Sequence, residues 1–367
     1  MKEKVGIITV YGENNFGNKL QNYASIKLYN NLGLEAETIK VIQSRMILNK
    51  KEKIKNIIKR VIQYIPTHRY IRYQFLKEEK FRKFSRFYLN TIGDYNTHSI
   101  TKNILEDYKY LSVGSDQVWN DTDFNKNDIY YFSLHGVKSP QVIALSPSIG
   151  KISLKKENEI ILKEALKNYK AISCREKHGA EYIKELLGQE CRILIDPTMA
   201  LERSEWINLE KKPSWLNDTK YALCYFLGGI EKNKEIIKKT CDNKKIKIID
   251  ILDKRTKFFN TSPEEFIYLI HNADIIFTDS FHACVFSIIF NKNFVVYDRE
   301  NQESVMNSRI ENLFSLFGVN NVEYGKTYNF NEIDNKDEVL KYNRNEVLEY
   351  LKQALGIDYN LVSISYR

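Results

Sequence analysis

Short apolar runs alternate along the chain with longer segments in which apolar residues recur at helical spacing. The first run, residues 5–10, has the length of a buried strand. A polar, glycine-bearing loop follows it, and Leu20, Ala24 and Leu28 then share one face of a predicted helix. A second apolar run at 35–42 completes a β-α-β unit. We therefore expect two parallel strands joined by a right-handed crossover.

The same rhythm continues through the chain and predicts an α/β fold in two halves. Further strands are expected at 108–113, 141–145, 171–173 and 192–195, and then at 221–227, 246–251, 273–278 and 293–297. Helices are expected at 155–168, 176–187, 231–240, 310–317 and 338–355, and two more begin at Ser262 and near Phe281. The start at Ser262 is well marked, because a capping serine precedes a proline and two acidic residues.

A polar stretch at 206–218, punctuated by Trp206, fits a linker between two domains. We expect a Rossmann-like N-terminal domain at 1–205, a Rossmann-like C-terminal domain at 219–330, and a C-terminal helix and tail at 331–367. Open sheets of this type bind ligands at the carboxyl ends of their strands. A cleft between the two halves is therefore the expected place for a site.

Residues 44–90 interrupt this rhythm and are expected to form a basic helical hairpin inserted into the first domain. The part from 45 to 86 holds 14 Lys or Arg and three Glu, so it is more basic than the whole chain, whose net charge is +9. Pro66 separates an isoleucine-rich helix from an aromatic one that reaches about Tyr88. The hairpin is either a solvated cover or a surface that docks on anionic lipid. It contains no recognisable nucleic-acid-binding module, and we predict no nucleic-acid partner.

The composition places the protein among soluble, cytoplasmic proteins, because no apolar run is long enough for a secretory signal or a membrane span. The five cysteines are scattered and odd in number, so we expect reduced thiols in or near the cores. They form no metal-binding spacing with histidine, and we predict no metal and no cofactor.

Two polar segments that follow predicted strands are candidates for binding sugar hydroxyls. The first contains Asn15, Asn18 and Gln21 beside Lys19, although an ordinary strand-to-helix turn would use the same residues. The second contains a carboxylate, two small hydrogen-bonding groups and an indole, which together suit a sugar; these residues are Ser115, Asp116, Gln117 and Trp119. The alternative for this second segment is a capped turn beside a buried tryptophan.

A third candidate combines residues from both halves of the chain. Arg175 follows a strand of the first half, and Ser280 and His282 follow a strand of the second, so the cleft should bring them together. Arginine fits carboxylate or phosphate, and histidine exchanges protons near neutral pH. Each also has an ordinary structural interpretation, since Arg175 could pair with Glu176 and His282 could simply begin a helix.

These motifs, in this order, resemble the polysaccharide pyruvyl transferase family. The resemblance extends from the first strand to about Leu313 and also includes an Asp-Pro-Thr motif at 196–198 and Ser308-Arg309-Ile310. It implies a GT-B-like fold, phosphoenolpyruvate as the donor, and a lipid-linked or polymeric saccharide as the acceptor on which a pyruvate ketal forms. By this likeness Arg175 would bind the donor and His282 would transfer protons.

The chain departs from the family where several members have Arg-Leu-His and this sequence has Ser280-Phe281-His282. Arg309 or Lys19 could supply the missing positive charge. The resemblance also implies work on a surface-polysaccharide precursor, at the inner face of the plasma membrane if the basic hairpin docks there. The alternatives are a GT-B glycosyltransferase with a nucleotide-sugar donor and a non-catalytic partner in polysaccharide assembly.

Overall fold

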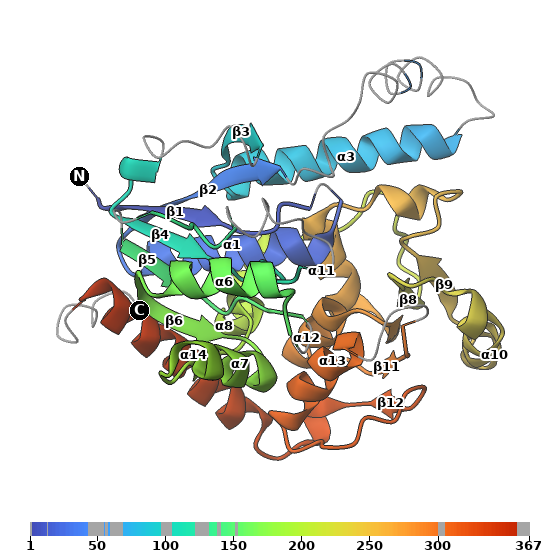
Figure 1. Cartoon of the computed structure of the whole chain (residues 1–367). Coiled ribbons are helices and arrows are strands. Elements are labelled where there is room, and N and C mark those ends of the chain that lie inside the picture. Colours follow the sequence, from blue (N-terminus) through green and yellow to red (C-terminus); the bar gives the residue numbers. More distant parts are fainter. Residues whose placement is uncertain are drawn as a thin grey trace.

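The computed structural model describes residues 2–12, 14–42, 55, 58, 69–96, 105–121, 132–137, 141–150, 153–299 and 305–357. They form two open α/β sheets, one of seven strands and one of five, with helices packed on them (Figure 1). The expected alternation of strands and helices is therefore confirmed. The predicted first helix of the basic hairpin lies outside the described residues, apart from the exposed Lys55 and Ile58.

The first sheet has the strand order β3-β2-β1-β4-β5-β6-β7, and its paired strands are parallel. Its strands are β1 (Lys4–Ile8), β2 (Glu35–Ile42), β3 (Ile92–Asn96), β4 (Tyr110–Val113), β5 (Gln141–Ala144), β6 (Tyr169–Cys174) and β7 (Arg192–Ile193). Its helices are α1 (Phe16–Asn31), α3 (Arg69–Tyr88), α6 (Lys156–Leu166), α7 (Lys177–Leu187) and α8 (Pro197–Ala200). Strand β3 was not predicted, because its sequence IGDYN has no apolar run.

The second sheet has the order β12-β11-β10-β8-β9, in which only β12 is antiparallel to its neighbour. Its strands are β8 (Tyr221–Tyr225), β9 (Lys247–Asp250), β10 (Ile275–Thr278), β11 (Phe294–Val296) and β12 (Thr327–Tyr328). Its helices are α10 (Lys234–Lys244), α11 (Pro263–Asn272), α12 (Phe281–Ile289) and α13 (Val305–Ser315), with a 3-10 turn η4 (Lys257–Asn260). Ser262 and Glu265 cap α11 reciprocally, which confirms the predicted helix start.

An apolar seam joins the two sheets. Phe16 at the start of α1 stacks on Phe266 of α11 with ring centroids 4.5 Å apart. Trp206, which we expected in a linker, is fully buried on helix α9 (Arg203–Leu209), between Tyr23 of the first domain and Phe286 of the second. The predicted linker therefore begins within a short helix whose tryptophan is packed between the two domains.

Two helices cross between the domains (Figure 1). Helix α3 belongs to the insertion in the first domain, yet Lys80 on it forms an ion pair of 2.7 Å with Glu265 on α11. Helix α14 (Lys336–Leu355) follows the second sheet and returns to the first, where the Tyr350 hydroxyl donates to the carbonyl oxygen of Ala144 at 2.7 Å. Helix α3 of the first domain therefore contacts the second domain, and helix α14, which follows the second domain, packs on the first.

Candidate functional site

The carboxyl ends of β6 and β10 meet at the seam between the domains, as the sequence predicted. Arg175 follows β6 directly, and its backbone N–H donates to the carbonyl oxygen of Pro147 at 3.0 Å. His282 lies in the first turn of α12, immediately after the loop that leaves β10. Arg175 is 8% exposed and His282 is 7% exposed, so any group that they bind is largely removed from water.

Asp196 joins these two side chains. Its Oδ2 atom accepts a hydrogen bond of 2.8 Å from Nη1 of Arg175 and lies 3.7 Å from Nε2 of His282. The hydroxyl of Ser115 donates to the same oxygen at 3.1 Å. The other carboxylate oxygen accepts from the backbone N–H and hydroxyl of Thr198, at 3.0 and 2.7 Å. Arginine and histidine from different domains thus share one carboxylate oxygen.

The electrostatics of the site follow from burial and close pairing. Burial alone would raise the pKa of Asp196, but His282 and Arg175 outweigh it and hold that pKa well below its ordinary value. Burial opposes the charge of Arg175, yet Glu176 and Asp196 raise its pKa above the ordinary value. Asp196 and Arg175 are therefore both ionised at neutral pH.

At this site Nη2 of Arg175, Nε2 of His282 and Oε2 of Glu176 are buried without a hydrogen-bond partner among the described residues. Nε of Arg175 is already used, since it donates to Glu176 at 2.9 Å. A buried polar atom that makes no hydrogen bond costs about 1–3 kcal/mol, so such atoms are uncommon unless a ligand completes them. The unused donors fit an anionic ligand.

Arg309 on α13 supplies a second buried guanidinium. Its Cζ atom lies 5.1 Å from the ring centroid of Phe281, and that of Arg175 lies 4.8 Å from the same ring. Nη2 of Arg309 is 3.9 Å from Asp116. Burial and the nearby Arg175 lower the pKa of Arg309 to about 10, so it too is charged at pH 7. A cavity of about 240 Å³ touches Arg175, Phe281 and Arg309.

The other two donor-site candidates lie differently. Ser280 is buried at the N-cap of α12, where its backbone N–H donates to the hydroxyl of Thr278 at 3.0 Å. Lys19 is also buried, and its Nζ atom stands 3.3 Å from the ring centroid of Tyr11. Neither side chain lines the cavity beside Arg175 and Arg309.

The backbone of the first turn of α1 lies close to the imidazole of His282. A Cβ atom built on Gly17 would lie 2.2 Å from Nδ1 of His282, far inside contact distance. Glycine is therefore needed here because the helix backbone approaches the imidazole closely. The Asn-Phe-Gly motif, which we took for a ligand-binding turn, also sets the position of His282.

The predicted acceptor residues differ in how far they are buried, and several of them are hydrogen-bonded to one another or to the backbone. Asn18 donates through Nδ2 to Asp116, and Asn15 caps α1 by accepting from the Asn18 backbone N–H at 3.2 Å. Gln21 is buried, where it donates to the hydroxyl of Thr9 and accepts from the backbone N–H of Ser115. Asn15, Asn18 and the side chain of Gln117 are half-buried, whereas Asp116, Ser115 and Gln21 are buried.

Trp119 corrects one prediction. Its indole is fully buried in the core of the first sheet, with its centroid 6.5 Å from that of Tyr169. It presents no face to a sugar, so the alternative of a buried tryptophan is the correct one. Its apolar neighbours are distant in sequence, and the local pattern did not show them.

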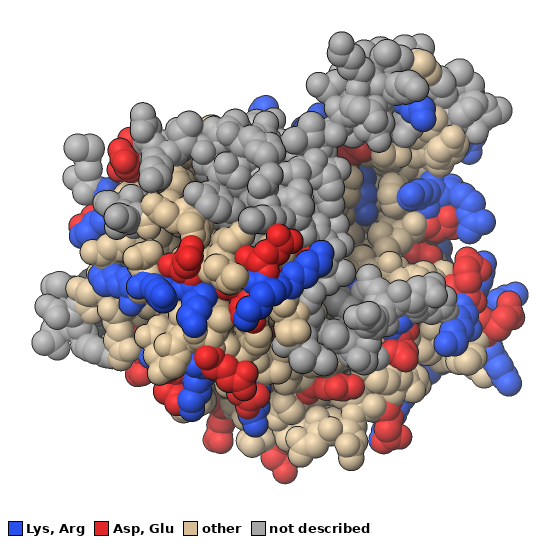
Figure 2. Space-filling model, in the orientation of Figure 1, with Lys and Arg blue, Asp and Glu red and all other residues tan. Residues whose placement is uncertain are grey.

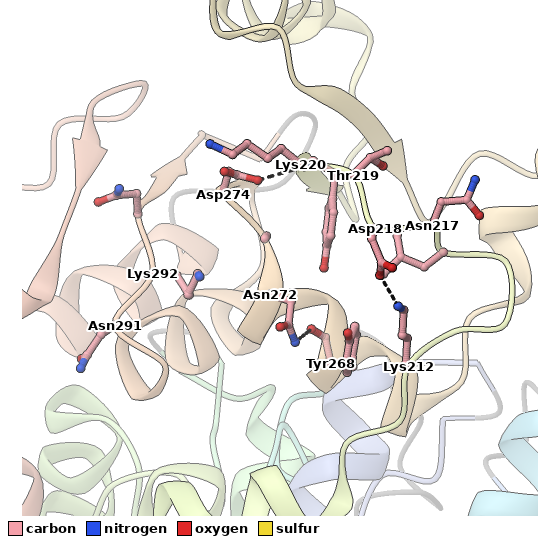
Figure 3. Close-up of a pocket in the computed structure, with 14 residues that line it drawn as sticks. Lys212, Asn217, Asp218, Thr219, Lys220, Tyr268, Asn272, Asp274, Asn291 and Lys292 are labelled. Atoms are coloured by element: carbon pink, nitrogen blue, oxygen red, sulfur yellow. Dashed lines mark hydrogen bonds and ion pairs between the residues drawn. The ribbon is translucent and has the colours of Figure 1, made fainter.

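A polar pocket of about 570 Å³ lies at the opposite edge of the second sheet, by the amino ends of β8, β10 and β11 (Figure 3). Lys212 and Asp218 point toward each other across it and form an ion pair. Asp274 accepts the backbone N–H of Tyr221 at 3.0 Å. Lys212, Asp218 and Asp274 therefore hold local structure. Among the described residues that line this pocket, none belongs to the Arg175–His282 site.

Sequence reasoning missed the central residue, Asp196, and the supporting Glu176. Asp-Pro-Thr reads as an ordinary helix cap, and Asp196 does cap α8. The signal that could have identified it is its position shortly after β7, the strand that pairs with β6, which Arg175 follows. In the part of the chain that the structure describes, no group of three or more His, Cys, Asp or Glu is arranged to hold a metal ion.

Comparisons with known proteins identify the family and the fold of the chain. The sequence model of a family described as "Polysaccharide pyruvyl transferase" matches residues 15–301. The structure of S. aureus MnaA with UDP is similar, at 12% identity over 98% of each chain and a TM-score of 0.51, which confirms the GT-B-like fold. UDP-GlcNAc 2-epimerase from Neisseria meningitidis, bound to UDP-GlcNAc, aligns at 10% identity over 94% of this chain and all of its own, with a TM-score of 0.46. No curated protein sequence matches the chain.

Proposed function

Because the chain belongs to the polysaccharide pyruvyl transferase family, we propose that it transfers the pyruvyl group of phosphoenolpyruvate to a sugar of a surface-polysaccharide precursor. The products are a pyruvate ketal and free phosphate. The observation that carries the proposal is the pair of unsatisfied buried donors, Nη2 of Arg175 and Nε2 of His282, beside the same oxygen of Asp196. Phosphoenolpyruvate is a small anion that could accept from both.

In the proposed reaction the methylene carbon of phosphoenolpyruvate gains a proton, and its second carbon becomes cationic. One sugar hydroxyl adds to that carbon, the bond between the carbon and the phosphate oxygen breaks, and a second hydroxyl closes the ketal as its proton leaves with the phosphate. His282 gives the first proton and then accepts one from a sugar hydroxyl. Asp196 places a negative charge 3.7 Å from Nε2 of His282, beside the nitrogen at which the proton moves.

The two arginines neutralise the donor. Arg175 offers Nη2 to the carboxylate or phosphate, while its other bonds to Glu176 and Asp196 fix the plane of the guanidinium. Arg309 is the cation that we assign in place of the arginine absent at Ser280, because its guanidinium stands over the same phenylalanine ring as that of Arg175. Lys19 packs on Tyr11 instead and is the weaker candidate.

The test is a phosphate-release assay with phosphoenolpyruvate across a panel of lipid-linked and free oligosaccharides. His282→Ala is expected to abolish release and keep the wild-type circular dichroism spectrum. His271→Ala is the matched control, because His271 contacts Glu210, at 2.8 Å, and Phe290 rather than residues of the Arg175–His282 site. Full phosphate release by His282→Ala would refute the assignment.

We also propose that the enzyme acts at the cytoplasmic face of the membrane through its basic insertion. The described part of that insertion, α3, exposes several cations and Phe87, which is 71% exposed; the cations are Arg69, Arg72, Arg82, Lys83 and Arg86. Each such cation near anionic lipid contributes about 1 kcal/mol. In the described residues, no helix has both the length and the apolar character needed to span a bilayer.

Flotation with anionic and neutral liposomes tests this location. Arg82→Glu with Arg86→Glu should abolish flotation with anionic vesicles, and added salt should weaken it in the wild type. Flotation that is indifferent to lipid charge, salt and these substitutions would reject membrane docking and leave the pyruvyl transfer proposal untouched.

A further inference from the structure

A separate cavity of about 800 Å³ lies at the carboxyl ends of β8 and β9 in the second domain. The loop after β8, the first half of α10 and the segment after Asp250 form its wall. This is the edge at which open parallel sheets bind ligands. Among the described residues that line it, none belongs to the site around Arg175 and His282.

We propose that this cavity binds a nucleoside diphosphate, the carrier of the acceptor sugar. The role of that sugar as the acceptor rests on the proposed function, whereas the binding of the nucleoside diphosphate does not. Three features of the cavity carry the proposal: its strand-end carboxylate, its uncommitted lysines and its connection to the loop before His282.

The carboxylate is Asp250, which ends β9, the strand next to β8. One of its oxygens accepts from the Leu252 backbone N–H at 2.9 Å, and the side chain is half-buried in the cavity wall. An acid at the end of the second strand, about 20 residues after a glycine turn, is positioned to accept from both ribose hydroxyls. Gly229 belongs to that turn, with φ 105° and open space around the position of a Cβ atom.

The cavity combines apolar and basic walls. Ile230, Leu252 and Phe258 offer a surface for a flat base. Lys238 and Lys254 also line it, and neither has a carboxylate within 4 Å among the described residues. Figure 2 shows basic side chains, interspersed with acidic ones, along the rim formed by β9 and α10. Two uncommitted ammonium groups suit a diphosphate.

The cavity is coupled to the pyruvyl transfer site through Asp279. Its two carboxylate oxygens accept the backbone N–H groups of Leu227 and Gly228, each at 2.7 Å. Leu227 and Gly228 line the cavity, and Asp279 stands three residues before His282 in the loop between β10 and α12. The same loop thus supports both sites, and a sugar on the terminal phosphate is the part of the ligand that would reach toward the imidazole.

A lipid diphosphate would share the phosphates but has no vicinal hydroxyls for Asp250. The two sources are therefore separable in a titration calorimetry experiment on the full chain with UDP, GDP, inorganic pyrophosphate and a polyprenyl diphosphate in detergent micelles. UDP or GDP should bind at least about tenfold more tightly than pyrophosphate, because the base and ribose add contacts. Lys254→Glu should weaken both kinds of ligand about tenfold or more.

Asp250→Asn gives the sharper result. It should weaken the nucleoside diphosphate about tenfold and leave pyrophosphate binding unchanged or tighter, because it removes a negative charge. Lys239→Glu makes the same charge change as Lys254→Glu, at a position of α10 outside the cavity lining. It is the matched control for the lysine variant and should change the binding of neither ligand.

The proposal is overturned if neither UDP nor GDP binds at about 1 mM. It is also overturned if pyrophosphate binds as tightly as UDP and GDP. A third contradicting result is that polyprenyl diphosphate binds and neither UDP nor GDP displaces it. It is also overturned if Asp250→Asn affects UDP and pyrophosphate alike. His282→Ala should bind the nucleoside diphosphate normally. Such binding in a wild-type protein that releases no phosphate from phosphoenolpyruvate would reject the proposed function and keep this site.

Discussion

Replacing Asp196 with asparagine removes the charge that Arg175 and His282 share. In the variant an amide N–H₂ or a weaker carbonyl acceptor would face Nη1 of Arg175, which now lies 2.8 Å from a carboxylate oxygen. Arg175 would keep only its bond to Glu176 as a charged partner at hydrogen-bond distance. Breaking a buried ion pair on one side costs about 3–5 kcal/mol, and we expect a loss of unfolding free energy in that range at pH 7.

The loss should depend on pH with a definite sign. Because the folded state lowers the pKa of Asp196, its ionised form stabilises the fold above the pKa of the unfolded chain, about 3.9. That stabilisation disappears as pH falls through the lower pKa of the folded protein. The difference between wild type and Asp196→Asn should therefore shrink as pH falls below about 4.

Urea unfolding followed by tryptophan fluorescence measures this difference, since Trp119 and Trp206 are both fully buried. Asp218→Asn is the control, because Asp218 is an exposed acid paired with Lys212 and should leave stability unchanged. If Asp196→Asn unfolds at the wild-type urea concentration at pH 7, or if the difference grows as the solution is acidified, the assigned role of Asp196 is wrong.

Three further substitutions test separate parts of the structure. Gly17→Ala should lower the rate of phosphate release about 100-fold, because its methyl group displaces His282; an unchanged rate would contradict the close contact. Burial, helped by nearby Lys254, lowers the pKa of Lys77 to about 7, so its charge destabilises the fold most below pH 7 and progressively less toward pH 10. Lys77→Met should therefore raise the urea midpoint at pH 6 more than at pH 9, and equal effects would exclude this explanation. Tyr350→Phe should cost about 1 kcal/mol in thermal unfolding, and no loss would mean that its hydroxyl contributes nothing to docking α14.

Local patterns predicted most of the fold because most of its strands are buried, parallel and apolar. β2 was placed at its observed bounds, 35–42, and the start of α11 followed from its capping residues alone. β3 was missed because a polar edge strand gains its stability from pairing with β2 rather than from an apolar run. The burial of Trp206 could not be predicted, because it depends on Tyr23 and Phe286, which no local window contains.

The site was predictable to the extent that topology determines it. Arg175 and His282 were expected to converge because both follow parallel strands at their carboxyl ends, and the structure joins them through Asp196. The role of Asp196 depends on the order of neighbouring strands, which the sequence does not state. Trp119 is a residue type that often packs against sugar rings. Only the three-dimensional packing shows that its indole is fully buried.

The crossing of α3 and α14 limits how this enzyme can move. A wide hinge opening would have to break the Lys80–Glu265 pair at one end and strip Tyr350 from the first sheet at the other. These two contacts therefore restrain the movement of one domain relative to the other. The distance between Arg175 and His282 is accordingly set before a substrate binds.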